Sequence, residues 1–151
     1  MTMRLLMVCL GNVCRSPTAE AAVRAVITAR GMNATVESCG TAAYHEGKGA
    51  DPRTIAHAAR RGLDLRRHRA RQLRPGDFAA FDSIYAMDEA NLADLTRQCP
   101  PEHLQKVALF LGDAEVPDPW SGGPADFERV LDLCQGRADQ LLTTALGTPG
   151  P

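Results

Sequence analysis

The sequence predicts a single α/β domain with three layers (α/β/α): a four-stranded parallel sheet covered by helices on both faces. Two observations favour this class. Short apolar runs of strand length alternate along the chain with longer helical patterns, which is typical of right-handed βαβ units. The chain also has 151 residues, enough for one core, and we expect one domain over residues 1–151 with a frayed tail at 147–151.

Four runs rich in apolar and β-branched residues are the expected strands. Because ligands bind at the carboxyl ends of parallel strands, the loops after the first, second and fourth strands are the candidate binding loops. The expected strands are residues 4–8, 34–38, 83–87 and 107–111.

The expected helices start after capping residues and end at glycine where one is present. Ser16 is the expected N-cap of the first helix, with Pro17 at its first position and Gly31 at its end. Asp51 is the expected N-cap of the second helix, which Gly62 ends. The expected helices are residues 17–30, 52–61, 89–97 and 125–146.

The charge is close to balanced overall but is distributed unevenly. The net charge is −1, which argues against nucleic acid or a membrane surface as a partner. Residues 1–74 carry 13 Arg and Lys against 5 Asp and Glu, whereas residues 75–151 carry 4 against 13. Eight arginines lie between residues 53 and 74; without interleaved aromatic residues they are interpreted as a solvated surface, and substrate steering is the alternative.

The cysteines indicate a reducing compartment. There are five, at positions 9, 14, 39, 99 and 134, an odd number without regular spacing. The apolar run at residues 5–10 is too short for a signal peptide, so we expect a cytoplasmic protein, with export without a signal as the alternative. No cysteine or histidine spacing predicts a metal site, and Cys39 and Cys134 are expected to be core thiols.

The loop after the first strand has the composition of an anion-binding site. Cys9 ends an apolar strand, Gly11 and Asn12 permit unusual backbone dihedrals, and a helix starts a few residues later. Successive N–H groups and a helix N-terminus then favour a thiolate at Cys9, and the Arg15 fork can hold two phosphoryl oxygens. The alternative is a buried, inert Cys9 with Arg15 on the surface; the whole segment favours the first interpretation.

The segment Cys-Leu-Gly-Asn-Val-Cys-Arg-Ser-Pro at residues 9–17 resembles the signature of the low-molecular-weight protein tyrosine phosphatases, here of a bacterial type. Further matching segments follow in the family's order, including Asp51-Pro52-Arg53 and Met87-Asp88-Glu89, so that the resemblance covers residues 4–142. It implies a flavodoxin-like fold with a phosphate-binding loop after the first strand. The loop residues besides Cys9 and Arg15 would be Leu10, Gly11, Asn12, Val13, Cys14 and Ser16.

The resemblance also implies a mechanism without a cofactor or metal. Cys9 would be the nucleophile, Arg15 would bind the phosphoryl group, and Asp118, between two prolines after the fourth strand, would be the general acid and base. Tyr44 and Trp120 would form the walls of the substrate pocket, with core packing as the alternative. Ser121 stands where the family usually has a second tyrosine.

A supporting network is implied around the loop: Ser38 and His68, with Asn12 and Ser16, would hold it by hydrogen bonds. Asp88 matches an aspartate that assists the acid loop, and capping of the next helix is the alternative. The expected partner is a phosphotyrosine-containing protein, such as a bacterial tyrosine kinase or its substrate, and phosphate-like oxyanions should inhibit.

Three other interpretations stay open. The first is arsenate reduction coupled to a thiol, although residues 87–97 lack the cysteine pair of relatives that use thioredoxin. The second is phosphoarginine hydrolysis. Val13 argues against it, because related enzymes of that kind carry threonine at this position. The third is an anion-binding or redox-sensing module in which Cys9 and Cys14 form a disulfide.

Overall fold

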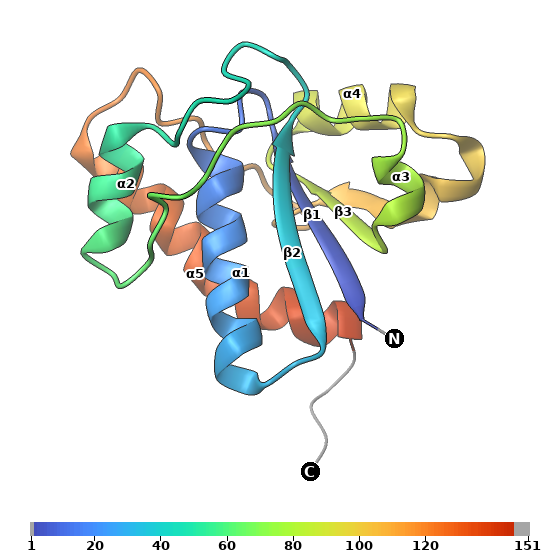
Figure 1. Ribbon diagram of the computed structural model, residues 1–151, viewed down its shortest axis with the longest axis horizontal. Helices are drawn as coiled ribbons and strands as arrows, with labels where there is room; N and C mark the ends of the chain where they lie inside the picture. Colours follow the sequence, from blue (N-terminus) through green and yellow to red (C-terminus); the bar gives the residue numbers. More distant parts are fainter. Residues whose placement is uncertain (1, 147–151) are drawn as a thin grey trace.

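The computed structural model describes residues 2–146 and is a three-layer α/β/α structure, as predicted (Figure 1). Its sheet has four strands in the order β2-β1-β3-β4, and all pairs are parallel. The elements along the chain are β1 (Met3–Cys9), α1 (Arg15–Arg30), β2 (Ala34–Gly40), α2 (Pro52–Ala59), α3 (Asp77–Ala80), β3 (Ser83–Ala86), α4 (Glu89–Gln98), the 3-10 helix η1 (Pro101–Lys106), β4 (Val107–Leu109) and α5 (Pro124–Leu146).

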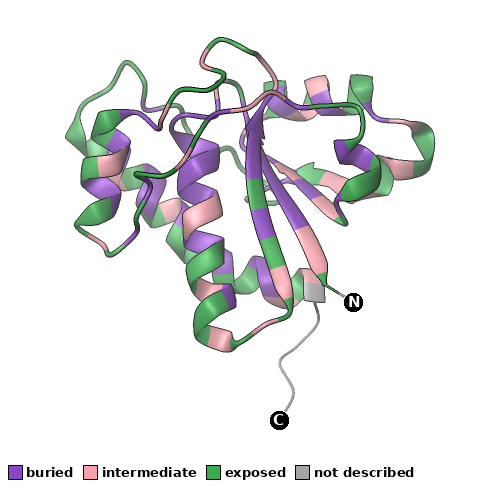
Figure 2. Cartoon of the chain, in the orientation of Figure 1, coloured by how far each residue is buried: buried purple, intermediate pink, exposed green. Residues whose placement is uncertain are grey.

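Strand β1 is the centre of the core because its side chains alternate between the two faces of the sheet. Leu5 and Met7 pack with apolar residues of α1 and α5. Leu6 and Val8 pack on the other face, against Phe78 and other residues of the region from α3 to α4. Figure 2 shows β1 and the start of α1 as largely buried, so the carboxyl end of this strand is a fixed platform.

The first helix starts earlier than predicted, and Ser16 is not its N-cap. Helix α1 begins at Arg15, and Cys14 holds the N-cap position without a side-chain hydrogen bond. The Ser16 hydroxyl instead lies 3.0 Å from the Cys9 sulfur and accepts a hydrogen bond from Asn12. The predicted caps Asp51 and Gly31 are confirmed: the Asp51 carboxylate accepts from the Arg53 amide, and Gly31 has φ of 61°.

Two short elements were not predicted from the sequence. Helix α3 has 4 residues and η1 has 6, and neither is long enough to show a helical repeat of apolar residues. Strand β4 is also shorter than expected and ends at Leu109. The predicted tail at 147–151 lies outside the described residues.

The basic first half and the acidic second half of the chain form one structure. Parallel pairing places β1 between β2 and β3, so the two halves share one sheet. Ion pairs across the halves join Arg15 to Asp88, Arg30 to Asp139, Arg61 to Asp132 and Arg71 to Asp77. Within residues 2–146, no helix has the length and apolar character needed to cross a membrane.

Candidate active site

The loop at residues 9–16 joins β1 to α1 and wraps around the sulfur of Cys9. The Asn12 amide donates a hydrogen bond to this sulfur at 3.2 Å, and the Ser16 hydroxyl lies 3.0 Å from it. Asn12 has φ of 58°, in the left-handed region, which turns its amide inward. The sulfur therefore has an N–H donor and a hydroxyl group within hydrogen-bonding distance.

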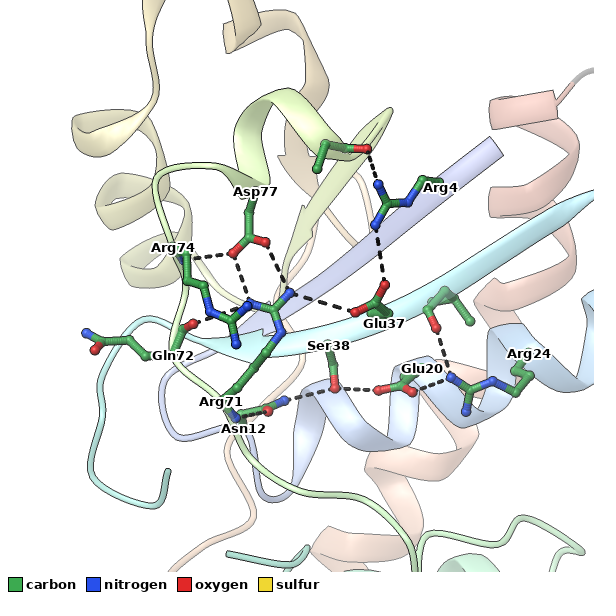
Figure 3. Close-up of polar contacts among 12 residues, drawn as sticks. Arg4, Asn12, Glu20, Arg24, Glu37, Ser38, Arg71, Gln72, Arg74 and Asp77 are labelled. Carbon is green, nitrogen blue, oxygen red and sulfur yellow. Dashed lines mark hydrogen bonds and ion pairs between the residues drawn. The ribbon is translucent and has the colours of Figure 1, made fainter. Parts of the chain in front are cut away.

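Asn12 is the centre of a buried hydrogen-bond network that holds the loop (Figure 3). Its side-chain amide donates to the Ser16 and Ser38 hydroxyls at 2.8 and 2.9 Å, and its side-chain oxygen accepts from the Arg71 backbone amide at 3.0 Å. The His68 ring nitrogen Nε2 lies 2.7 Å from the Asn12 carbonyl oxygen. The structure therefore brings the supporting residues Ser38 and His68 to the loop.

The network extends to two residues that the sequence analysis missed. Ser38 donates a hydrogen bond to Glu20, which is also paired with Arg24, and Arg24 donates to the Val36 carbonyl at 2.8 Å (Figure 3). The spacing of Glu20 and Arg24 by four residues indicates a helical ion pair, but nothing in it points to Ser38 on a neighbouring strand. The loop is therefore supported from the surface of α1 as well as from the core.

Arg15 is almost fully buried and is held by acidic partners. Its Nη1 donates to Asp88 at 2.7 Å and to the Val116 carbonyl at 3.2 Å, and its Nη2 lies 3.7 Å from the Asp118 carboxylate. Burial opposes its charge, but Cys9, Asp88 and Asp118 outweigh that effect and raise the pKa of Arg15. The guanidinium therefore stays charged beside the Cys9 sulfur.

Asp88 caps helix α4, the alternative considered for it, and it also binds Arg15, a contact that the sequence did not indicate. One carboxylate oxygen accepts from the Asn91 amide at 2.7 Å and caps α4, and the other binds Arg15. Each oxygen thus has its own partner, so capping and positioning of Arg15 do not compete.

Asp118 faces Cys9 and Arg15 across a pocket of about 300 Å³. Its side chain is 50% exposed, and one oxygen accepts from the Trp120 amide at 3.1 Å. The pocket is therefore open to solvent on the side of Asp118 and closed on the side of the loop. The residues lining it are Cys9, Leu10, Gly11, Val13, Cys14, Arg15, Tyr44, His45, Asp118 and Trp120.

Two exposed aromatic side chains flank the mouth of this pocket. Tyr44 is 72% exposed and Trp120 is 49% exposed, which excludes core packing as their role. His45, which the sequence analysis missed, lies with its ring 5.5 Å from the Trp120 ring. A Cβ at Gly11 would lie only 3.0 Å from the His45 ring, so glycine allows this close approach. No spacing or composition signal marks His45 in the sequence.

Arg53, which lies in a matching segment but was given no role from the sequence, connects the loop that carries Asp118 to α2. Its guanidinium donates to the Trp120 carbonyl at 3.0 Å and lies 5.6 Å from the Trp120 ring centroid. It is also bonded to the Asp51 carboxylate through two nitrogens, at 3.1 and 2.9 Å. Arg53 therefore holds the backbone next to Asp118.

The five cysteines, all within the described residues, are buried and form no disulfide. Burial raises the pKa of Cys14 to about 12 and that of Cys134 to about 12, so both stay protonated at neutral pH. Cys39 and Cys134 lie in the core, as predicted. Cys14 shares the pocket with Cys9.

The fold and this pocket together define a class of protein: an α/β domain that presents a cysteine sulfur and a buried arginine in one anion-binding loop. The family model described as low molecular weight phosphotyrosine protein phosphatase matches residues 4–148. The chain belongs to this family and is a hydrolase of the protein-tyrosine-phosphatase type.

Individual relatives match over nearly the whole chain. A low molecular weight protein-tyrosine-phosphatase of Streptomyces coelicolor is 42% identical and covers 94% of this chain and 93% of its own. The crystal structure of a protein tyrosine phosphatase from Entamoeba histolytica with Hepes in the active site has a TM-score of 0.90 and 38% identity, covering 96% of this chain and 97% of its own. The solved structure of Vibrio vulnificus Wzb in complex with benzylphosphonate has a TM-score of 0.85 and 30% identity, covering 95% of this chain and 99% of its own.

Proposed function

We propose that this protein hydrolyses phosphotyrosine in proteins through a phosphocysteine intermediate. The Cys9 thiolate attacks phosphorus, and the bond from phosphorus to the phenolic oxygen breaks. Arg15 and the backbone amides of residues 10–16 bind the other three phosphoryl oxygens. Protonated Asp118 gives its proton to the leaving phenolate oxygen, so that tyrosine departs neutral.

In the second step, water attacks the phosphorus of phosphocysteine. The Asp118 carboxylate takes a proton from this water, and inorganic phosphate and the Cys9 thiolate are released. Both steps use the same three side chains and need no cofactor, because Arg15 and the amides provide the positive field. Phosphate-like oxyanions are expected to compete for the same loop.

The observation that carries the proposal is that Cys9, Arg15 and Asp118 line one pocket whose mouth has aromatic walls. Tyr44 and Trp120 can contact a phenyl ring above the loop. Benzylphosphonate, bound by Vibrio vulnificus Wzb, likewise places a phenyl ring next to a tetrahedral anion. Val13 adds an apolar surface, which favours an aryl phosphate over phosphoarginine. Cys99 packs in the core on the far face of the sheet.

The natural substrate we propose is a phosphotyrosine-containing protein, such as a bacterial tyrosine kinase or one of its substrates. A cytoplasmic location fits this proposal, because the free thiols of all five cysteines suit a reducing compartment.

The test is hydrolysis of p-nitrophenyl phosphate and of phosphotyrosine, phosphoserine and phosphoarginine peptides. Cys9→Ser should lower kcat by roughly 10⁴-fold or more, as removal of a nucleophile does in other enzymes with covalent intermediates. Cys99→Ser, which removes a thiol away from the pocket, is the matched control and should retain kcat. Equal rates on the three peptides, or unchanged turnover by the Cys9 variant, would contradict the proposal.

A further inference from the structure

A second pocket of about 250 Å³ adjoins the one that contains Cys9. The two pockets share Val13, His45 and Trp120, so the Trp120 side chain is a wall of both. We call the second the Lys48 pocket. Its lining residues are Val13, His45, Lys48, Gly49, Ala50, Asp51, Pro52 and Trp120.

The backbone around Lys48 is fixed although its side chain is exposed. The Lys48 amide donates to the His45 carbonyl, and the Lys48 carbonyl accepts from the Ala70 amide, both at 2.8 Å. The Gly47 amide donates to the Ala70 carbonyl at 2.8 Å, and the Asp51 amide donates to the Val13 carbonyl at 2.9 Å. Hydrogen bonds on both sides therefore hold this segment against the phosphate-binding loop and the segment around Ala70.

The charge in the Lys48 pocket is positive. The Lys48 ammonium has no hydrogen bond or ion pair with any other residue in the described part of the chain, 2–146. The Asp51 carboxylate in the pocket wall is already paired with Arg53 at 2.9 and 3.1 Å. Arg69 lies behind Gly49 and, among residues 2–146, donates only to the backbone carbonyls of His68 and Arg66, at 2.7 and 3.4 Å. An unpaired ammonium beside a neutralised carboxylate attracts an anion.

We infer that the Lys48 pocket is a subsite for an acidic side chain next to the phosphotyrosine, with Lys48 pairing to its aspartate or glutamate carboxylate. The inference rests on the proposed function, since it concerns a peptide whose phosphotyrosine occupies the pocket with Cys9. The shared Trp120 wall puts the two pockets next to each other, within reach of neighbouring side chains of one extended peptide. Exposed aromatic rings such as Tyr44 at the mouth give the peptide backbone a surface to lie on.

The subsite gives the enzyme a preference among phosphotyrosine sites without altering the chemistry. An exposed ion pair is weak, and a two- to five-fold effect on kcat/KM is the size to expect. The effect acts through substrate binding, so it should appear in KM while kcat stays constant.

The experiment uses a set of peptides that each contain one phosphotyrosine and one glutamate. The glutamate stands at one of the three positions before the phosphotyrosine or at one of the three positions after it. Each has a partner peptide with glutamine at the same position. We expect kcat/KM to be two- to five-fold higher for glutamate than for glutamine at one position, with the difference shrinking as salt is added. Lys48→Gln should abolish the difference, and Lys48→Glu should reverse it.

Arg60→Gln is the matched control, because Arg60 is exposed, makes no ion pair within residues 2–146 and lies at the end of α2 outside both pockets. It removes one positive charge but should keep the glutamate preference. Equal kcat/KM for glutamate and glutamine at all positions would overturn the subsite while leaving the proposed function intact. An equal loss of the glutamate preference in Lys48→Gln and Arg60→Gln would also overturn the subsite, because it would indicate long-range electrostatic steering. If none of the phosphotyrosine peptides is hydrolysed, the proposed function itself fails and the subsite with it.

Discussion

The two loops that face each other across the pocket are built in different ways. The phosphate-binding loop, residues 9–16, is mostly buried and held by the network around Asn12. The acid loop, residues 112–123, is mostly exposed. Near Asp118 it is held through the Val116 backbone, which bonds to Met87 and Arg15, and through bonds from Arg53 and the Trp120 amide. A thiolate and its anion cradle need fixed donors, whereas substrate must enter past the acid. Substitutions in the phosphate-binding loop should therefore affect both folding and catalysis. Substitutions of the exposed residues of the acid loop should affect catalysis alone.

After Cys9→Ser, the largest expected effect on catalysis is that of Asp118→Asn. Loss of the general acid should lower kcat by roughly 10²–10⁴-fold for phenyl phosphate, whose leaving group needs a proton. The loss should be smaller for p-nitrophenyl phosphate, which has a better leaving group. Because the side chain is half exposed, the free energy of unfolding should stay unchanged. Urea denaturation alongside kinetics checks both, and a large loss of stability would break the contrast between the loops.

Asn12→Ala should damage both folding and catalysis. The variant removes the hydrogen bonds of Asn12 to the Ser16 and Ser38 hydroxyls and to the Arg71 amide, which should lower the free energy of unfolding by about 1–3 kcal/mol. Alanine at positive φ should lower it by about 1 kcal/mol more. Asn12→Gly is the control, since it removes the same hydrogen bonds without the backbone strain and should be about 1 kcal/mol more stable than the alanine variant. A variant with wild-type unfolding free energy would contradict the role of Asn12 as the centre of the network.

Arg53→Met should have a smaller effect, directed at the acid loop. Without the bond to the Trp120 carbonyl, we expect kcat for phenyl phosphate to fall about two- to five-fold, with less change for p-nitrophenyl phosphate. Arg60→Met, which removes an exposed arginine outside the pocket, should leave both rates at the wild-type level. An equal fall for the two substrates would show that Arg53 does not act through the acid.

The same variant has a pH signature in stability. Burial disfavours the charged form of the Asp51 carboxylate and by itself would raise its pKa. Hydrogen bonds from Arg53 outweigh this effect and lower the pKa of Asp51 below its ordinary 3.8. A carboxylate with a lowered pKa contributes stability above its unfolded pKa and loses it as the pH falls through the folded value. The deficit of Arg53→Met in unfolding free energy at pH 7 should therefore shrink below pH 3.8. Urea titrations at pH 7 and pH 3 measure this.

The smallest expected effect is alkylation of Cys14 at neutral pH. With a pKa of about 12, only about one Cys14 in 10⁵ is ionised at pH 7. Iodoacetamide should therefore inactivate the enzyme with one label, at Cys9, as peptide mapping by mass spectrometry would show. Equal labelling of both cysteines would contradict the assignment of a protonated Cys14.

The sequence was sufficient for the main elements and for the position of the loop at residues 9–16 between the first strand and the first helix. Apolar runs and caps such as Asp51 are local signals, and the four long helices and four strands formed within a few residues of their expected bounds. Ser16 shows where local reasoning fails. A serine before a proline has the pattern of an N-cap, but in the folded chain its hydroxyl is next to the Cys9 sulfur, and the helix starts two residues earlier than expected, at Arg15.

Residues without a local signal became visible only in three dimensions. His45, Lys48 and Arg53 lie in or next to the loop after β2, a candidate binding loop, but nothing in the sequence gave them individual roles. Their contacts depend on which segments the sheet brings together. The order β2-β1-β3-β4 places the loops after β1, β2 and β4 at one edge. Contacts between residues far apart in the sequence depend on that strand order. They do not produce a periodic pattern of residues in the sequence.

By itself, then, the sequence determined the α/β class and the candidate anion-binding loop from Cys9 to Ser16, which depend on residue type and on spacing along the chain. Asp118 as the candidate acid came from the resemblance of the sequence to the phosphatase family. Only the tertiary structure decided how Asp88 both caps α4 and holds Arg15, how Arg53 reaches the acid loop, and that the Lys48 pocket shares a wall with the pocket of Cys9. The physical reason is that hydrogen bonds, ion pairs and pocket walls depend on distances in space.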